Sequence, residues 1–223
     1  MRWKALTFAI AFTATAGFAG RSADGPELGL TQAWCPVADD PGAGTHVLGI
    51  EHDGMLRSYE AHVPVSYDGA IPAPLVVALH GFASDPTEMA ALAGLDAVAD
   101  LEGFITVYPA GFQGSWNSGG CCGAASVANV DDVDFVVSVV EDAAARFCVD
   151  VDRVYVAGIA TGDDMASLIA MERPDVFAAA ATLAGSDPLT SWAGMALGPL
   201  ADDAAWQMWD SLSGPDLSGP DLP

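Results

Sequence analysis

The stretch from Arg153 to Ala170 constrains the fold most, because a strand pattern runs directly into a helix pattern there. Its first part, 154–156, is a β-branched and aromatic run that predicts a buried strand. Its second part has residues at helical spacing: Met165, Leu168, Ile169 and Glu172. The joint is the pentapeptide GIATG, with Ala160 in the middle. The sequence therefore predicts a strand, a tight glycine-flanked turn and a helix in immediate succession.

Other segments carry further strand and helix patterns. The segment 46–63 alternates and turns at Asp53-Gly54, which predicts a hairpin of two strands. Three apolar runs predict further strands, the first suited to the centre of a parallel sheet: 74–79, 104–109 and 177–183. Two segments with apolar residues at helical intervals predict helices: 86–101 and 133–144.

Several motifs in a fixed order resemble one family. They include HGFASDPTEMAAL from His80, WNSGGCCGAA from Trp116, and the segment that leads through VDDVDFVVSVVEDAAARFC to the turn at Ala160. The chain resembles the secreted esterases of the polyhydroxybutyrate depolymerase and feruloyl esterase group from His80 to about Gly185, and more weakly back to Arg57. The resemblance implies an α/β fold of the α/β-hydrolase type, with a doubly wound, mostly parallel sheet that is truncated at its C-terminal side.

In that fold the glycine-flanked turn is the nucleophile elbow, whose middle residue is Ser, Cys or Asp. Here it is Ala160, and a methyl group cannot attack a carbonyl. The flanking elbow glycines are Gly158 and Gly162. If the elbow is retained, Ala160 should have a positive φ.

The resemblance also assigns the surrounding residues. The oxyanion hole is formed by the backbone N–H groups of Phe82 and Thr161. The pocket is bordered by His80, Gly81, Trp116 and Asn117. His80 is expected to brace its loop rather than to act as a base, because the triad order is nucleophile, acid, histidine, and all four histidines precede Ala160.

The implied function is hydrolysis of hydroxyalkanoate or hydroxycinnamoyl esters, without a cofactor. We expect this activity to be impaired or absent, because the serine is replaced and no histidine follows it. Asp163 and Asp164 also stand where the family has small or apolar residues, which disfavours an oxyanion. Two alternatives remain open: a non-catalytic protein that binds a small-molecule or polymeric ester, and a decayed gene product without function.

The N-terminal and C-terminal segments differ from the rest in composition. Residues 1–19 have two basic residues and then an apolar run, which predicts a signal peptide and a secreted, extracellular or periplasmic protein. An N-terminal extension is expected over 20–45, an incomplete hydrolase core over 46–187, and a divergent, partly disordered tail over 188–223. The net charge of −23 argues against nucleic acid or an anionic membrane as partners.

The cysteines and the histidines bear on crosslinks and metals. Four cysteines in an exported chain favour disulfides over a metal site: Cys35, Cys121, Cys122 and Cys148. The resemblance favours a bond from Cys148 to Cys121 or Cys122, with the remaining cysteine bonded to Cys35 or free. We expect no metal site, because the three histidines of the hairpin, His46, His52 and His62, spread over two faces. Three acids near 131–134 are expected to cap a helix rather than to bind calcium.

Overall fold

The computed structural model describes residue 35 and residues 39–119 and 123–183 of the chain. The predicted signal segment, most of the N-terminal extension, the predicted tail, and Cys121 and Cys122 lie outside the described residues. The strands are β1 (Gly44–His52), β2 (Met55–Val63), β3 (Ala73–Leu79), β4 (Ile105–Pro109), β5 (Val149–Ile159) and β6 (Ala179–Leu183). The helices are α1 (Pro86–Ala93), α2 (Leu95–Glu102), α3 (Ala124–Ala128), α4 (Asp132–Arg146) and α5 (Thr161–Glu172).

The six strands form one mixed sheet in the order β1-β2-β4-β3-β5-β6. β1 and β2 are the predicted hairpin, and Asp53 and Gly54 turn it with φ values of 49° and 71°. β2 pairs antiparallel with β4, whereas β4, β3, β5 and β6 are mutually parallel. The all-apolar strand β3 is buried at every residue and lies inside the parallel part of the sheet, as the sequence predicts.

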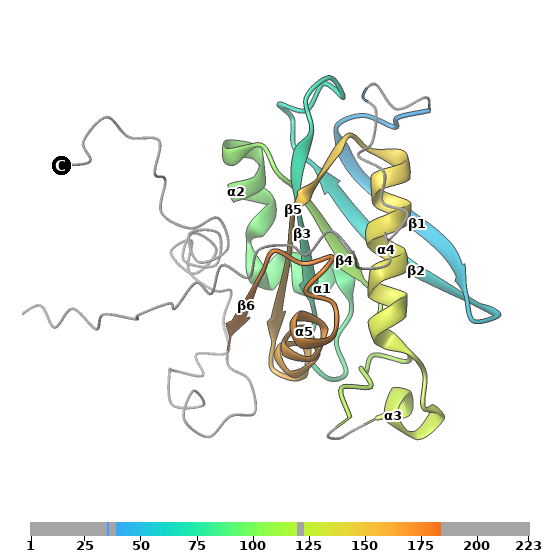
Figure 1. Cartoon of the computed structure of the whole chain (residues 1–223). Helices are drawn as coiled ribbons and strands as arrows, with labels where there is room; N and C mark the ends of the chain where they lie inside the picture. Colours follow the sequence, from blue (N-terminus) through green and yellow to red (C-terminus); the bar gives the residue numbers. More distant parts are fainter. Residues whose placement is uncertain (1–34, 36–38, 120–122, 184–223) are drawn as a thin grey trace, which may run out of the picture.

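Helices cover both faces of the sheet and give the fold three layers (Figure 1). α4 and α5 pack on one face around a core that includes Leu75, Val77 and Phe135. α1 and α2 pack on the other face, against Val76, Ala78 and their neighbours. The chain crosses from β4 on one side of β3 to β5 on the other, which creates a topological switch point at the carboxyl ends of these strands.

The prediction of one continuous helix over 86–101 is wrong. The segment 86–101 forms two helices, α1 and α2, because Gly94 takes a left-handed conformation with φ 65° between them. Its apolar positions still face the sheet, where Met89, Leu95 and Val98 are buried. The spacing therefore predicted the buried face correctly but not the break.

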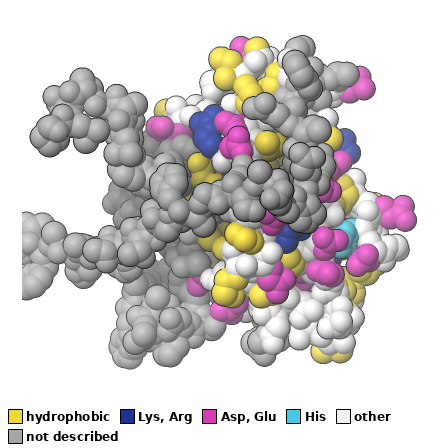
Figure 2. Space-filling view, in the orientation of Figure 1, with side chains coloured by type: hydrophobic (Ala, Val, Ile, Leu, Met, Phe, Trp, Pro, Cys, Tyr) yellow, Lys and Arg dark blue, Asp and Glu magenta, His cyan; other side chains and the backbone are white. Residues whose placement is uncertain are grey.

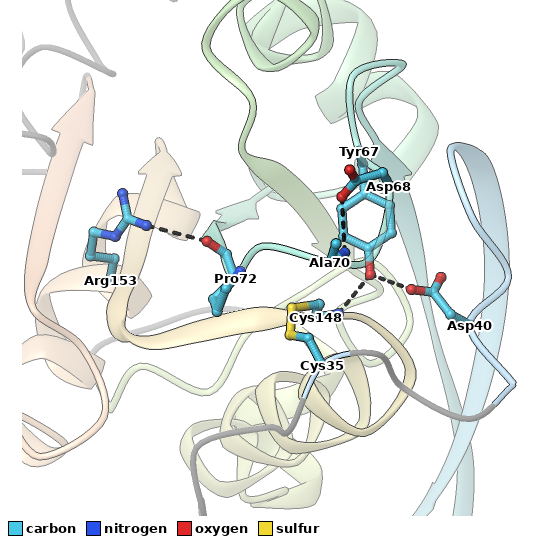
Figure 3. The surroundings of a disulfide bond; sticks show 8 residues. All are labelled: Cys35, Asp40, Tyr67, Asp68, Ala70, Pro72, Cys148 and Arg153. Carbon is cyan, nitrogen blue, oxygen red and sulfur yellow. Dashed lines mark hydrogen bonds between the residues drawn. A yellow bond between two sulfur atoms is a disulfide. The ribbon is translucent and has the colours of Figure 1, made fainter.

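A disulfide joins Cys35 to Cys148, with 5.5 Å between their Cα atoms (Figure 3). The preferred bond from Cys148 to Cys121 or Cys122 is therefore wrong. The backbone N–H of Asn117, in the loop that precedes those two cysteines, is bonded to the first residue of α4. Cys148 follows the other end of this 15-residue helix, which spans about 22 Å at 1.5 Å per residue.

Two hydrogen bonds support the disulfide (Figure 3). The Cys148 N–H donates to the Tyr67 hydroxyl at 2.7 Å, and that hydroxyl donates to Asp40. Burial and the neighbouring Asp40 carboxylate raise the pKa of Tyr67, so the phenol keeps its proton. Cys35 and Asp40 are thus tied to the start of β5 and to the β2–β3 connection, respectively.

Acidic side chains are spread over the described part of the face shown in Figure 2, with few basic side chains among them. This agrees with the net charge of −23. Within the part of the chain that the structure describes, no helix has both the length and the apolar character needed to cross a membrane.

Candidate functional site

The site is built around Ala160, which joins β5 to α5. Ala160 has φ 54° and ψ −118°, so the positive φ predicted for it is confirmed. L-residues rarely adopt this conformation, and it persists only where the surrounding structure imposes it. The side chain of Ala160 is exposed at the apex of the turn.

Close backbone contacts impose the turn. A Cβ atom at Gly158 would lie 2.0 Å from the Gly162 carbonyl oxygen. A Cβ atom at Gly162 would lie 2.3 Å from the Leu79 oxygen and 2.6 Å from the His80 oxygen. Only glycine fits at either position, because β5 meets α5 directly and α5 begins against the end of β3.

Residues 80–83, called the arm below, follow β3 and face the apex of the turn. A Cβ atom at Gly81 would lie 3.5 Å from the Ala160 Cβ, which is ordinary contact distance. The next residue, Phe82, is 54% exposed, and Ala83 has a positive φ of 58°. The arm and Ala160 therefore form two sides of one exposed site.

His80, the first residue of the arm, is buried, and backbone groups bind both of its ring nitrogens. Its Nε2 accepts a hydrogen bond from the Gly111 N–H at 2.9 Å, so the ring proton is on Nδ1. Nδ1 then donates to the Gly81 carbonyl at 2.7 Å. Burial lowers the pKa of His80 below its usual value and keeps the ring neutral. This geometry agrees with a bracing role and leaves neither nitrogen available to a reacting hydroxyl.

The loop 110–117, which follows β4, packs against His80. Trp116 is 1% exposed, its ring centroid lies 4.9 Å from that of His80, and its Nε1 donates to the His80 carbonyl at 2.8 Å. The Asn117 side chain donates to the Val130 carbonyl at 2.9 Å. Of the residues predicted to border a pocket, His80 and Trp116 are thus buried, and Gly81 contacts the elbow.

An open pocket of about 320 Å³ lies between the start of α4 and the outer part of α5. It is lined by Asn117, Gly119, Asn129, Val130, Asp131, Asp132, Val133, Leu168 and Glu172. Asn117 is the member that was predicted to border a pocket. Leu168 lies seven residues beyond Thr161 in α5, about 10 Å along the helix axis, so this pocket is separate from the Ala160 apex.

The acids at the start of α4 have two different roles. Asp131 caps the helix as predicted, since its side chain accepts from the Asp134 N–H at 3.0 Å. Asp132 does not cap the helix, which corrects that part of the prediction. It is 1% exposed and forms an ion pair with Arg57 at 2.9 Å. No local pattern marks this pair, because its members are 75 residues apart in the sequence.

Each of the three hairpin histidines has a different partner: His46 lies beside the Gly42 carbonyl, His52 beside Ser138 Oγ, and His62 beside Asp100. Among residues 39–119 and 123–183, no three His, Cys, Asp or Glu side chains converge on a point that could hold a metal ion.

Comparison with known sequences identifies a family. The family model described as Esterase PHB depolymerase matches residues 58–190, more than half of the chain. The match includes most of β2 and all of β3 through β6, and so covers the elbow, the arm and the loop 110–117.

Individual relatives are similar over part of their length. NocK of Nocardia uniformis subsp. tsuyamanensis, a protein provisionally named an esterase, is 34% identical over 69% of this chain and 44% of its own length. Poly(3-hydroxyalkanoate) depolymerase C of Paucimonas lemoignei is 34% identical over 59% of this chain and 32% of its own. Feruloyl esterase B of Neurospora crassa is 32% identical over 50% and 38%. The chain spans less than half the length of these relatives.

A solved structure shares the fold. An acetyl xylan esterase from Aspergillus awamori superposes with a TM-score of 0.55 and 20% identity, over 64% of this chain and 52% of that protein. The α/β-hydrolase type of fold predicted from the sequence is therefore confirmed.

Proposed function

Because the chain belongs to the Esterase PHB depolymerase family, we propose that it keeps the frame of an ester hydrolase around a position that cannot act as a nucleophile. The observation that carries this proposal is the exposed methyl group of Ala160, held at the apex of the turn with φ 54° and ψ −118°. At this point a hydrolase of this fold presents the hydroxyl that attacks the ester carbonyl.

The oxyanion donors are proposed to remain. The backbone N–H of Thr161 follows the apex as the first residue of α5, where a helix leaves its N–H groups without intrahelical partners. The N–H of Phe82 lies in the arm, next to Gly81, which contacts Ala160. Both donors belong to the main chain, so the loss of a serine side chain does not remove them.

A further feature supports a loss of hydrolysis. Asp163 and Asp164 bring carboxylates to the first turn of α5. A carboxylate about 6 Å from a developing oxyanion costs about 2–3 kcal/mol at an effective dielectric of 20. Loss of a triad nucleophile alone lowers kcat by about 10⁶.

The ligand class follows from the relatives. Their names include a poly(3-hydroxyalkanoate) depolymerase and a feruloyl esterase, so hydroxyalkanoate and hydroxycinnamoyl esters are the proposed ligands of the frame.

Ester binding without hydrolysis is the second candidate function. It is favoured by the retention of the strained turn at Ala160 beside an arm with an exposed Phe82 ring.

Hydrolysis of p-nitrophenyl butyrate tests the proposal. The unmodified 223-residue protein should show no turnover above buffer and no labelling by a fluorophosphonate probe. Ala160→Ser introduces a hydroxyl at the apex, and Ala170→Ser, within the helix that follows the apex, is the matched control. Turnover together with labelling of the unmodified protein would overturn the proposal, because another nucleophile would then be present.

Binding is tested separately by amide NMR with methyl ferulate as the probe. Saturable shifts at Gly81, Phe82 and Thr161 support ester binding. Shifts confined to other residues, or no shifts at millimolar ester, contradict it.

A further inference from the structure

We propose that the buried ion pair of Arg57 and Asp132 positions the arm, acting through the loop 110–117. The inference rests on the proposed function in one respect, since that function assigns an oxyanion donor to the Phe82 N–H within the arm. Neither residue contacts the apex of the turn, so both are positioning residues rather than catalytic ones.

The ion pair is almost fully removed from water. Arg57 Nη2 lies 2.9 Å from Asp132 Oδ1, and the two side chains are 5% and 0% exposed. The guanidinium carbon also lies 3.7 Å from the centre of the Phe135 ring. Nη1 has no hydrogen-bond partner among the described residues. The buried charge of Arg57 is therefore stabilised mainly by the contacts of Nη2 and by the Phe135 ring.

The pair holds both ends of the loop 110–117. Arg57 Nη2 donates to the carbonyl of Ala110, the first residue of the loop, at 3.0 Å. Asp132 Oδ2 accepts from the N–H of Asn117, the last residue of the loop, at 2.8 Å. Since Arg57 lies in β2 and Asp132 begins α4, the loop is attached at each end to a regular element.

The loop in turn holds the arm by three hydrogen bonds. The Gly111 N–H donates to His80 Nε2 at 2.9 Å, and Trp116 Nε1 donates to the His80 carbonyl at 2.8 Å. The Ala83 N–H donates to the Gly114 carbonyl at 2.8 Å. Both ends of the arm are therefore hydrogen-bonded to the loop, and the ion pair fixes the position of the loop.

A buried ion pair is a poor device for stability alone. Replacing both members by apolar side chains of similar volume is often neutral or stabilising, because the desolvation cost of the two charges disappears. Here, however, such a replacement also removes the bonds to Ala110 and Asn117. This separates a positioning role from a structural one.

The test uses the full chain with Arg57→Met and Asp132→Leu combined. Arg153→Met with Asp150→Leu is the matched control, since it removes an ion pair of the same residue types whose members are 49% and 24% exposed. Two quantities are measured by NMR: the ¹⁵N shifts of the His80 ring, which report its tautomer, and amide exchange at Gly81, Phe82 and Ala83.

The double variant is expected to unfold at a temperature close to that of the unmodified protein. Its His80 nitrogens should lose their fixed Nδ1–H tautomer, and amide exchange in the arm should rise about tenfold, as expected for local opening. The control should keep both signals. An unchanged tautomer and unchanged arm exchange in a folded double variant would overturn the proposal.

Arg57→Lys keeps a charge beside Asp132, but its side chain is one atom shorter, so its ammonium group does not take the position from which Nη2 donates to both Ala110 and Asp132. It should shift the same signals in the same direction, and it tests the proposal if the double variant does not fold. Unchanged His80 signals in Arg57→Lys would count against the positioning role. These readouts need no ester turnover, so their failure is distinct from failure of the proposed function.

Discussion

Strain at Ala160 should make Ala160→Gly stabilising, although glycine usually destabilises a folded chain. A non-glycine residue in a sparsely populated conformation costs about 1–3 kcal/mol. The substitution removes this cost. Glycine also increases the conformational entropy of the unfolded chain, which destabilises the fold by about 0.5–1 kcal/mol. Ala160 is exposed, so deletion of its methyl group loses little burial. The expected net gain is about 1 kcal/mol in the free energy of unfolding.

Ala170→Gly is the matched control within α5. Ala170 is an ordinary helical residue, and glycine there should cost about 0.8–1 kcal/mol. The two variants should therefore move the urea midpoint in opposite directions. Their free energies of unfolding should differ by about 2 kcal/mol. The gain for Ala160→Gly corresponds to a rise of about 2–4 °C in Tm for a domain of this size. If Ala160→Gly loses as much stability as Ala170→Gly, the turn is not strained.

Three further predictions concern the turn, the disulfide and the buried histidine. Gly162→Ala places a Cβ 2.3 Å from the Leu79 oxygen and should cost about 3 kcal/mol in urea unfolding; a change within about 0.5 kcal/mol would contradict the close approach of α5 to β3. Cys35→Ser with Cys148→Ser opens a bond between residues 113 apart and should cost about 2–5 kcal/mol, matched by reduction of the unmodified protein. A loss below about 1 kcal/mol would show that the bond constrains little. Because burial lowers the pKa of His80, the unfolded chain takes up this proton first, and stability should fall as the pH drops below about 6.5. Urea unfolding at several pH values should show a weaker dependence in His80→Gln, and an equal dependence would exclude His80 as its source.

The features predicted best from the sequence are those that short segments determine. The order strand, glycine-flanked turn and helix around Ala160 follows from residue types that lie within 18 positions. The hairpin at Asp53-Gly54 and the buried run of β3 are likewise local, because alternation, turn residues and continuous apolar character each act between near neighbours.

The features that were missed depend on contacts between distant segments. The break at Gly94 needed a choice between a tolerated glycine and a helix end, which the spacing of apolar residues does not make. The partner of Cys148 depends on which cysteine-bearing segment the fold brings to the C-terminal end of α4, and that segment is the one with Cys35. Asp132 has the local pattern of a helix cap, and only the fold brings Arg57 beside it.

The order of the strands has a consequence for synthesis of the chain. β3 ends at Leu79, but β5, which covers one of its two edges, begins about 70 residues later at Val149. At about 5–20 residues per second, the ribosome needs about 4–14 s to make that stretch. During this time an apolar strand with an open edge must avoid pairing with other chains. The segment PLVVAL is therefore where we expect aggregation to begin if translation stalls before β5.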